Sequence, residues 1–208
     1  NQQNITKISD YISNMAIVLF HPDDLRFIKD APSTRRKTLN ISISLIYFQY
    51  LQYLNYYQNV LKQRNAYLKQ MIINANQSGE YLNILTEKLI EYGHYIYQKR
   101  AEFIQLINPY LTNYYEKITG SFGLQLEYIS SYQGVSKENL IKLYEKGLEK
   151  DLKFGKTHLG IHMDDLRFLL DGKDLKDYGS EGQQKNAIIA YKFSELEIFK
   201  VSTGNYPI

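Results

Sequence analysis

The sequence contains no cysteine. This excludes disulfide frameworks, thiolate catalysis and cysteine-built zinc sites, and it fits a reducing compartment. No apolar run approaches the roughly 20 residues of a membrane-spanning helix. The longest runs, Met15 to Phe20 and Ile41 to Phe48, are short or interrupted by serine. No basic segment followed by an apolar one indicates a signal peptide. These absences predict a soluble, cytoplasmic protein.

The sequence also lacks a large excess of positive or negative residues. The 208 residues include 25 Lys and Arg against 22 Asp and Glu, a formal net charge of +3. Binding to nucleic acid would therefore depend on local basic patches. Apolar residues make up 44% of the chain and charged residues 23%, which is typical of one large or two small globular domains. The final Tyr206-Pro207-Ile208 resembles the start of a strand, so we expect a piece of a longer protein.

Two long amphipathic stretches occupy the middle of the chain. In the first, apolar residues recur every three or four positions, with Arg64 as the exception: Tyr50, Leu54, Tyr57, Leu61, Leu68 and Met71. The second is interrupted only at Lys99: Leu82, Leu85, Leu89, Tyr92, Ile96, Phe103, Leu106, Tyr110 and Tyr114. A polar turn at 74–79 has the length that joins antiparallel helices. The pattern predicts a helical hairpin, packed as an antiparallel coiled coil with these stripes in its core.

Shorter elements flank this hairpin. Before it, the sequence predicts a helical stretch at 7–14, a buried strand at 15–20, a helical turn from Pro22, and a helix from Pro32 that breaks within 40–44. After it, we expect a strand at 122–129, a helix at 136–150 and a hairpin with strands at 166–170 and 173–178. A last helix is expected from Ser180 to about Val201. The predicted fold class is mainly α with small β elements (α+β).

The stretch with the clearest chemical potential is Ser180-Glu181-Gly182-Gln183-Gln184-Lys185. Small residues at a helix start leave backbone N–H groups without intrahelical partners at the positive end of the helix dipole, which favours an anion such as phosphate. Ser180 followed by Gln183 is equally typical of a capping box that needs no ligand. The motif alone leaves both interpretations open.

The order of these features resembles the ABC-type ATPases that act on DNA and, more narrowly, the RecF family of recombinational repair. Five stretches carry the resemblance: Val18-Leu19-Phe20-His21-Pro22-Asp23-Asp24-Leu25, Pro32 with Arg35-Arg36, Val60-Leu61-Lys62-Gln63-Arg64-Asn65, Gly160-Ile161-His162-Met163-Asp164-Asp165-Leu166, and Gly179 to Lys185. They span nearly the whole chain in the family's order. This favours the phosphate interpretation of Ser180.

The resemblance implies an ATPase head into which a helical arm is inserted. Residues 1–31 would form the strand and turn that lead from the head to the arm, 32–120 the helical hairpin arm, and 121–208 the strand, helix, hairpin and signature helix of the head. The chain contains no Gly-x-x-x-x-Gly-Lys-Ser/Thr phosphate loop and no apolar strand ending in paired acids. We therefore expect ATP and Mg²⁺ in the intact protein and neither on this piece alone.

The function that the resemblance implies is ATP-dependent DNA binding in recombinational repair and replication restart. The signature of one subunit would close over ATP held by the other, so that ATP joins a homodimer and hydrolysis releases it. Implied partners are single-stranded or gapped duplex DNA and the mediator proteins RecO and RecR, and the intact protein would be a slow DNA-dependent ATPase. The alternative from another class is a helical scaffold or protein-interaction module in which Ser180 only caps a helix.

Further site residues follow from the resemblance. His21 and Asp23 would lie in a loop near the nucleotide, although a helix-initiating turn explains Asp24 as well. His162, Asp164 and Asp165 would lie near the dimer interface or form a polar turn. A polar turn explains these three residues better than a metal site does.

Candidates for DNA binding are six basic residues: Arg35, Arg36, Lys37, Lys62, Arg64 and Lys69. They would bind DNA phosphates without regard to base sequence. The alternative to DNA binding is that these residues form a plain solvated face, or that Arg35 or Arg36 pairs with a carboxylate inside the head. The twenty tyrosines are better assigned to the helical core than to stacking on bases.

The sequence departs from the family pattern at five positions. Ile161 and Met163 replace proline and arginine, Glu181 replaces glutamine, and Lys185 and Asn186 replace arginine and threonine. The change at Met163 removes a basic residue, so a phosphate or DNA contact at that position is not expected.

Overall fold

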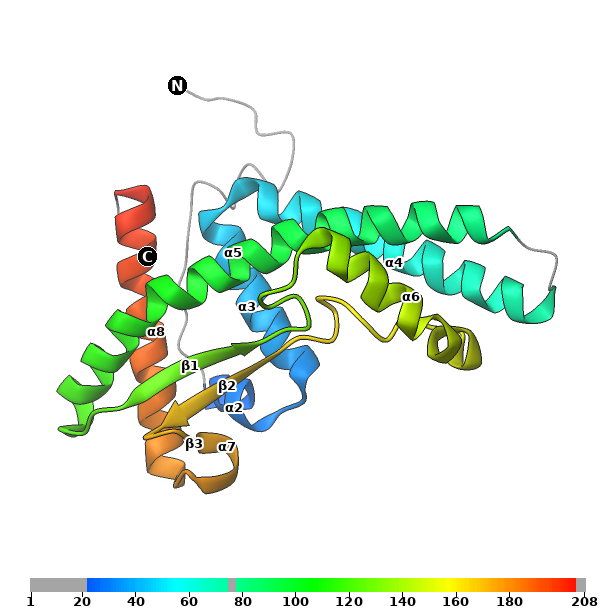
Figure 1. Cartoon of the computed structure of the whole chain (residues 1–208). Helices are drawn as coiled ribbons and strands as arrows, with labels where there is room; N and C mark the ends of the chain where they lie inside the picture. Colours follow the sequence, from blue (N-terminus) through cyan, green and yellow to red (C-terminus); the bar gives the residue numbers. More distant parts are fainter. Residues whose placement is uncertain (1–21, 75–77, 205–208) are drawn as a thin grey trace. The chain divides into compact units, whose positions relative to one another are not determined.

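The computed structural model describes residues 22–74 and 78–204 (Figure 1). The predicted helical stretch at 7–14, the strand at 15–20 and the start of a strand at 206–208 lie outside these ranges. The elements in chain order are η1 (Pro22–Leu25), α2 (Arg26–Lys29), α3 (Pro32–Ile46), α4 (Phe48–Ile73), α5 (Gly79–Thr119), β1 (Leu124–Ile129), α6 (Lys137–Phe154), β2 (Asp165–Leu170), β3 (Lys173–Asp174), α7 (Leu175–Tyr178) and α8 (Glu181–Thr203). The fold is mainly α with small β elements, as the sequence predicted.

The chain forms two compact units. Unit 1 comprises 1–48, 101–128 and 166–208, and unit 2 comprises 49–100 and 129–165. The long helix α5 contributes its first half to unit 2 and its second half to unit 1. These units cut across the three ranges expected from the sequence, whose role as domains stays a prediction. None of the described helices is long and apolar enough to cross a membrane.

Unit 2 contains the predicted helical hairpin, in which α4 and the first half of α5 run antiparallel, together with α6 (Figure 1). The buried stripe of α4 is Tyr50, Leu54, Tyr57, Val60, Arg64, Tyr67 and Leu68. It therefore includes Arg64, which the sequence pattern treated as a polar exception. Helix α6 begins after Ser136, whose side chain accepts a hydrogen bond from the Asn139 N–H, and ends at Gly155 in the left-handed conformation.

The stripe predicted for the second half of α5 is shifted. The sequence pattern placed Leu106, Tyr110 and Tyr114 in the core, but the buried residues are Phe103, Ile104, Ile107, Leu111 and Tyr115. The stripe passes through Arg100, which is only 1% exposed. The apolar pattern did not count Arg100 as a core position. It therefore did not follow the 3.6-residue repeat that leads from Ile96 through Arg100 to Phe103 and Ile107.

The predicted break within 40–44 was wrong, since α3 continues to Ile46 and extended backbone occurs only at Tyr47. The hydroxyls of Ser42 and Ser44 donate to the carbonyls of Thr38 and Asn40, four residues earlier. Serines that bond back in this way are compatible with a helix, so the polar residues did not end it.

The return strand predicted at 173–178 was also mostly wrong. Strand β3 is two residues long and pairs antiparallel with β2, with Leu170 opposite Lys173 and Leu169 opposite Asp174. The Asp174 carboxylate then accepts a hydrogen bond from the Lys176 N–H at 2.8 Å. This cap starts the short helix α7, so the chain leaves the sheet almost at once.

Unit 1 contains α3, α8, the second half of α5 and a three-stranded sheet with the order β1-β2-β3. Its centre contains an aromatic cluster, in which Phe27 lies edge-on to Phe168 and Tyr191 at centroid distances of 5.2 and 4.9 Å. Phe27 comes from α2, Phe168 from β2 and Tyr191 from α8, so the three rings connect these elements.

Side chains of α5 hold β1 in place. The Asn108 amide donates to the Leu126 carbonyl at 3.0 Å and accepts from the Leu126 N–H at 2.7 Å. The Thr112 hydroxyl donates to the Leu124 carbonyl at 2.9 Å. The backbone groups of β1 are thus bonded to a helix on this side.

Candidate functional site

The motif at Ser180 lies at the start of α8, a helix of 23 residues. The Ser180 hydroxyl accepts from the Gln183 N–H at 3.2 Å, and the Gln183 side chain accepts from the Ser180 N–H at 2.8 Å. The capping box considered from the sequence is therefore present. Both side chains are exposed, and a hydroxyl that accepts through oxygen still has its hydrogen to donate.

The first backbone donors of α8 face outward. In the described part of the chain, the N–H groups of Glu181 and Gly182 have no hydrogen-bond acceptor, whereas those of Gln183 and Gln184 bond to Ser180. A Cβ on Gly182 would have no atom nearer than the Ser180 oxygen at 3.9 Å. Lys185 is exposed one turn further along the helix. The site thus offers a hydroxyl, two N–H donors, a lysine and the positive end of a helix dipole.

Gln184 differs from its neighbours because its side chain points into the protein and is 4% exposed. Its amide nitrogen donates to the carbonyls of Leu175 at 2.7 Å and Gly179 at 3.3 Å. These carbonyls belong to α7 and to the residue just before Ser180. Gln184 therefore positions the segment that leads into the motif and does not itself face a ligand.

Replacing Gln184 by methionine is expected to lower the free energy of unfolding by about 1–3 kcal/mol, because two carbonyls lose their donor while the side-chain length is retained. Chemical denaturation measures the change. Gln183→Met is the matched control at an exposed position of the same turn, and it should cost less than Gln184→Met. Equal losses for the two variants would contradict the positioning role of Gln184.

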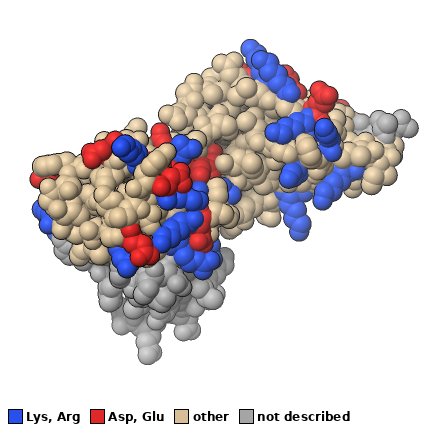
Figure 2. All heavy atoms as spheres, turned by 90° about the horizontal axis from the view of Figure 1, so that it is seen from below, with Lys and Arg blue, Asp and Glu red and all other residues tan. Residues whose placement is uncertain are grey.

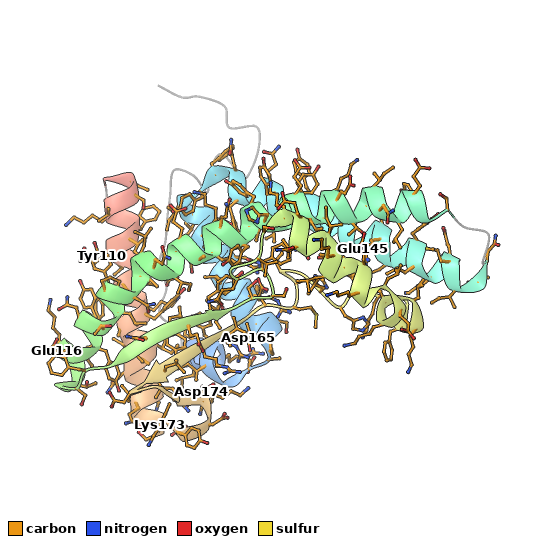
Figure 3. The ribbon with its side chains drawn as sticks, viewed as in Figure 1. Tyr110, Glu116, Glu145, Asp165, Lys173 and Asp174 are labelled. Carbon is orange, nitrogen blue, oxygen red and sulfur yellow. The ribbon has the colours of Figure 1, made fainter. Side chains whose placement is uncertain are left out.

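A hollow of about 250 Å³ lies beside the motif. Its lining includes Asp171, Lys173, Asp174, Tyr178, Gly179 and Gln183. Lys173 and Asp174, which are labelled in Figure 3, form β3 between β2 and α7. A polar group that entered this hollow would contact β3 and, from the motif, the Gln183 side chain.

His162 and Asp164 are used inside unit 2. The His162 Nδ1 lies 2.7 Å from the Tyr57 hydroxyl, and its Nε2 lies 3.1 Å from the Thr157 carbonyl. Because a carbonyl only accepts, Nε2 carries a hydrogen, and in the neutral ring Nδ1 accepts from Tyr57. Asp164 is 2% exposed and bonds to Arg100 at 2.9 Å. Asp165, labelled in Figure 3, begins β2 and is half-buried.

No metal site is built from these residues. Among the residues that the structure describes, no group of three or more His, Asp or Glu side chains could hold a metal ion. The proximity of His162, Asp164 and Asp165 to a dimer interface stays a prediction.

Arg64 lies within a buried ion pair. One guanidinium nitrogen donates to the Asp151 carboxylate and the Thr157 hydroxyl, each at 2.7 Å, and another donates to the Thr86 hydroxyl at 3.0 Å. Its exposure is 1%, and the group also lies over the Tyr144 ring, 5.3 Å from its centre. An arginine with these partners has no surface from which to contact DNA, so Arg64 is not retained as a DNA-binding candidate.

The other candidates for DNA binding divide into buried or half-buried arginines and exposed lysines. Arg35 is 5% exposed and donates to the carbonyls of Asp30 at 2.5 Å and Ile28 at 3.3 Å. Arg36 is half-buried, whereas Lys37, Lys62 and Lys69 are exposed. The exposed lysines are the ones whose charge reaches solvent.

Two further candidates, His21 and Asp23, are only partly covered by the structure. His21 lies outside the described residues. Asp23 lies within η1, which starts at Pro22 as the sequence predicted. The role of both residues near a nucleotide stays a prediction.

Sequence reasoning missed the second buried ion pair. Arg100 donates to Asp164 at 2.9 Å, to the Ile161 carbonyl at 2.8 Å and to the Tyr50 hydroxyl at 3.0 Å. Arg100 is adjacent to Lys99, and the only local signal is that it falls on the apolar face of α5. A charged residue on such a face indicates a buried partner, but not which residue the partner is.

Comparison with known proteins gives a consistent result. No family model matches the chain. The DNA replication and repair protein RecF of Ligilactobacillus salivarius is 39% identical over 100% of this chain and 57% of the relative, and that of Shouchella clausii is 35% identical over 97% and 56%. This chain thus spans a little more than half the length of these curated relatives.

Solved structures agree with the sequence comparison. A structure of the recombination mediator protein RecF with ATPrS, in the RecFOR pathway, matches with a TM-score of 0.90 and 32% identity over 98% of this chain and 56% of that one. The corresponding structure with ATP has a TM-score of 0.89, 32% identity and coverage of 95% and 54%. The sequence and structural similarities agree over nearly the whole of this chain, and the chain belongs to the RecF family.

Proposed function

We propose that this chain is the arm and signature part of an ATP-dependent, DNA-binding protein of DNA replication and repair. The relatives carry that name, and two similar structures contain RecF with ATP or ATPrS. The observation that carries the proposal is the exposed start of α8, where Ser180 has a hydroxyl and the N–H groups of Glu181 and Gly182 have no acceptor among the described residues.

The proposed mechanism places this helix start over the γ-phosphate of ATP held by a second subunit. Ser180 donates its hydroxyl hydrogen, Gly182 allows the backbone to approach, and Lys185 adds positive charge. Mg²⁺ and the phosphate loop come from parts of the protein that this chain does not include. Contacts made only with the γ-phosphate favour the dimer, and hydrolysis removes them. DNA, RecO and RecR remain the proposed partners.

The test is made in the full-length protein that carries this sequence. Ser180→Arg should leave ATP binding intact and abolish ATP-dependent dimerisation, because a bulky side chain blocks the approach of the second subunit. Ser180→Asp sharpens the test. Aspartate caps a helix as well as serine does, but its charge repels the γ-phosphate. We expect Ser180→Asp to keep the thermal stability and to lose the dimer, as measured by light scattering with and without ATP.

The second candidate function, a helical scaffold, is favoured by the complete capping box, which accounts for Ser180 and Gln183 without a ligand. It predicts that Ser180→Asp dimerises as the unmodified protein does. The matched control is Ser33→Arg, at another exposed serine in the first turn of a helix. If Ser180→Asp and Ser33→Arg both retain dimerisation and DNA binding, the signature proposal fails.

A further inference from the structure

Helix α4 carries no acidic residue along its 26 positions, although it is largely exposed on one side. Its exposed polar residues near the hairpin turn are amides and two lysines, Lys62 and Lys69. The C-terminal end of α6 and the residue after its Gly155 cap add three more exposed lysines, Lys150, Lys153 and Lys156. Figure 2 shows lysine and arginine side chains gathered on the face of unit 2 seen from below.

Packing brings the end of α6, with its lysines, beside the part of α4 that carries Lys62 and Lys69. The Lys69 side chain lies against Gly155, where its Cγ would be 2.9 Å from a Cβ. Asn65, one turn from both Lys62 and Lys69, accepts hydrogen bonds from the Thr157 N–H and hydroxyl, each at 2.7 Å. The end of α6 is therefore fixed beside this part of α4. We call Lys62, Lys69, Lys150, Lys153 and Lys156 the lysine surface.

The acidic groups nearby leave most of this charge uncompensated. Asp151 lies between the lysines of α6 in sequence, but it is 2% exposed and paired with Arg64. Glu149 is the exposed acid on this part of α6. His158 is half-buried against Asp151. Within the described residues, none of the five lysines forms an ion pair with a carboxylate.

We propose that the lysine surface binds the phosphate backbone of DNA without regard to base sequence, an inference that rests on the proposed function. The five exposed ammonium groups come from two helices and a loop, and each can neutralise one phosphate. Lysine ammonium groups carry no planar fork with which to select a base, so the contact positions the DNA and does not read it. Arg64 acts here as a positioning residue, because its pair with Asp151 holds α6 against α4.

The experiment uses the full-length protein with ATP and a fluorescent DNA duplex of mixed sequence, titrated over a series of salt concentrations. The test variant combines Lys69→Gln, Lys153→Gln and Lys156→Gln. The control variant combines Lys88→Gln, Lys117→Gln and Lys137→Gln, three exposed lysines outside the surface that give the same change in net charge. All six positions are exposed, so both variants should fold, and thermal unfolding checks this.

Each phosphate contact contributes about 0.9 to the slope of log affinity against log salt. The test variant should therefore reduce the slope by roughly 2–3 and weaken binding at least about tenfold at 0.1 M salt. The control variant should keep the slope of the unmodified protein. Equal slopes for all three proteins, or equal losses in both variants, would overturn the lysine surface while leaving ATP-dependent DNA binding intact. If the unmodified protein does not bind DNA with ATP, the proposed function itself fails.

Discussion

Replacing Arg64 by leucine is expected to lower the free energy of unfolding by about 3–5 kcal/mol. The change removes the cation from the Asp151 carboxylate, which is 2% exposed and cannot be hydrated where it lies. It also removes the donor shared with Thr157 and the donor to Thr86. A buried charge without a counterion is among the most costly results of a single substitution.

A double variant separates the charge from the packing. In Arg64→Met combined with Asp151→Leu, no charge is left buried, so most of the lost stability should return. Lys62→Leu, half a turn away on the exposed face of α4, is the control and should change stability by less than about 0.5 kcal/mol. Urea denaturation gives all four values. If Arg64→Leu costs no more than Lys62→Leu, the buried pair is not the feature that fixes α6 to α4.

The second large effect is expected at Gly160. Its φ angle is +126°, and a Cβ there would lie 2.5 Å from the Tyr57 hydroxyl and 2.7 Å from that of Tyr144. Both rings are buried, and both hydroxyls are already bonded, to His162 and to the Leu159 carbonyl respectively. Gly160→Ala should therefore cost about 2–4 kcal/mol, from backbone strain and from displaced side chains.

Gly147 provides the matched comparison in α6. A Cβ at this position meets nothing within 4 Å, and the residue lies within a helix. Gly147→Ala should raise the stability by about 0.4–1 kcal/mol, so that the two variants shift the melting temperature in opposite directions. A stable Gly160→Ala variant would show that Tyr57 and Tyr144 can move apart at little cost.

Burial also determines the ionisation of these tyrosines. It raises the pKa of Tyr57, Tyr132 and Tyr144 above the ordinary value, mainly because a phenolate would lose its hydration. Tyr132 and Tyr144 lie 3.1 Å apart through their hydroxyls, and Tyr144 donates to the Leu159 carbonyl. The hydroxyls therefore stay protonated. Those of Tyr57 and Tyr144 bond to the 159–162 segment, and that of Tyr132 bonds to Tyr144.

The sequence was sufficient to predict the long helices and the residues at which they begin. The hairpin could be predicted because its apolar repeat continues over many turns, and the starts at Pro32, Ser136 and Ser180 because a cap or a proline is a local signal. The predicted boundaries of elements were wrong where a side chain bonded to the backbone of a residue two to four positions away, as at Ser42 and Asp174. Such bonds favour a turn in one context and are compatible with a helix in another.

The buried charges could not be predicted in the same way. Arg64 and Asp151 are 87 residues apart in the chain, and Arg100 and Asp164 are 64 apart. Periodicity along one helix contains no information about a partner on another. The sequence therefore suggested Arg64 as a DNA-binding residue and passed over Arg100. It named Lys62 and Lys69 of the lysine surface, but not the three lysines that come from α6 and the loop after it.

The hydrogen bonds between Asn108 and Leu126 also bear on aggregation. Strand β1 is at the rim of the described three-stranded sheet, where unpaired backbone groups would be a template for a strand from another molecule. The Asn108 amide supplies one donor and one acceptor to Leu126, which is what a neighbouring strand would supply at that residue. A single side chain thereby imitates a strand one residue long, and it protects the rim of the sheet from intermolecular pairing.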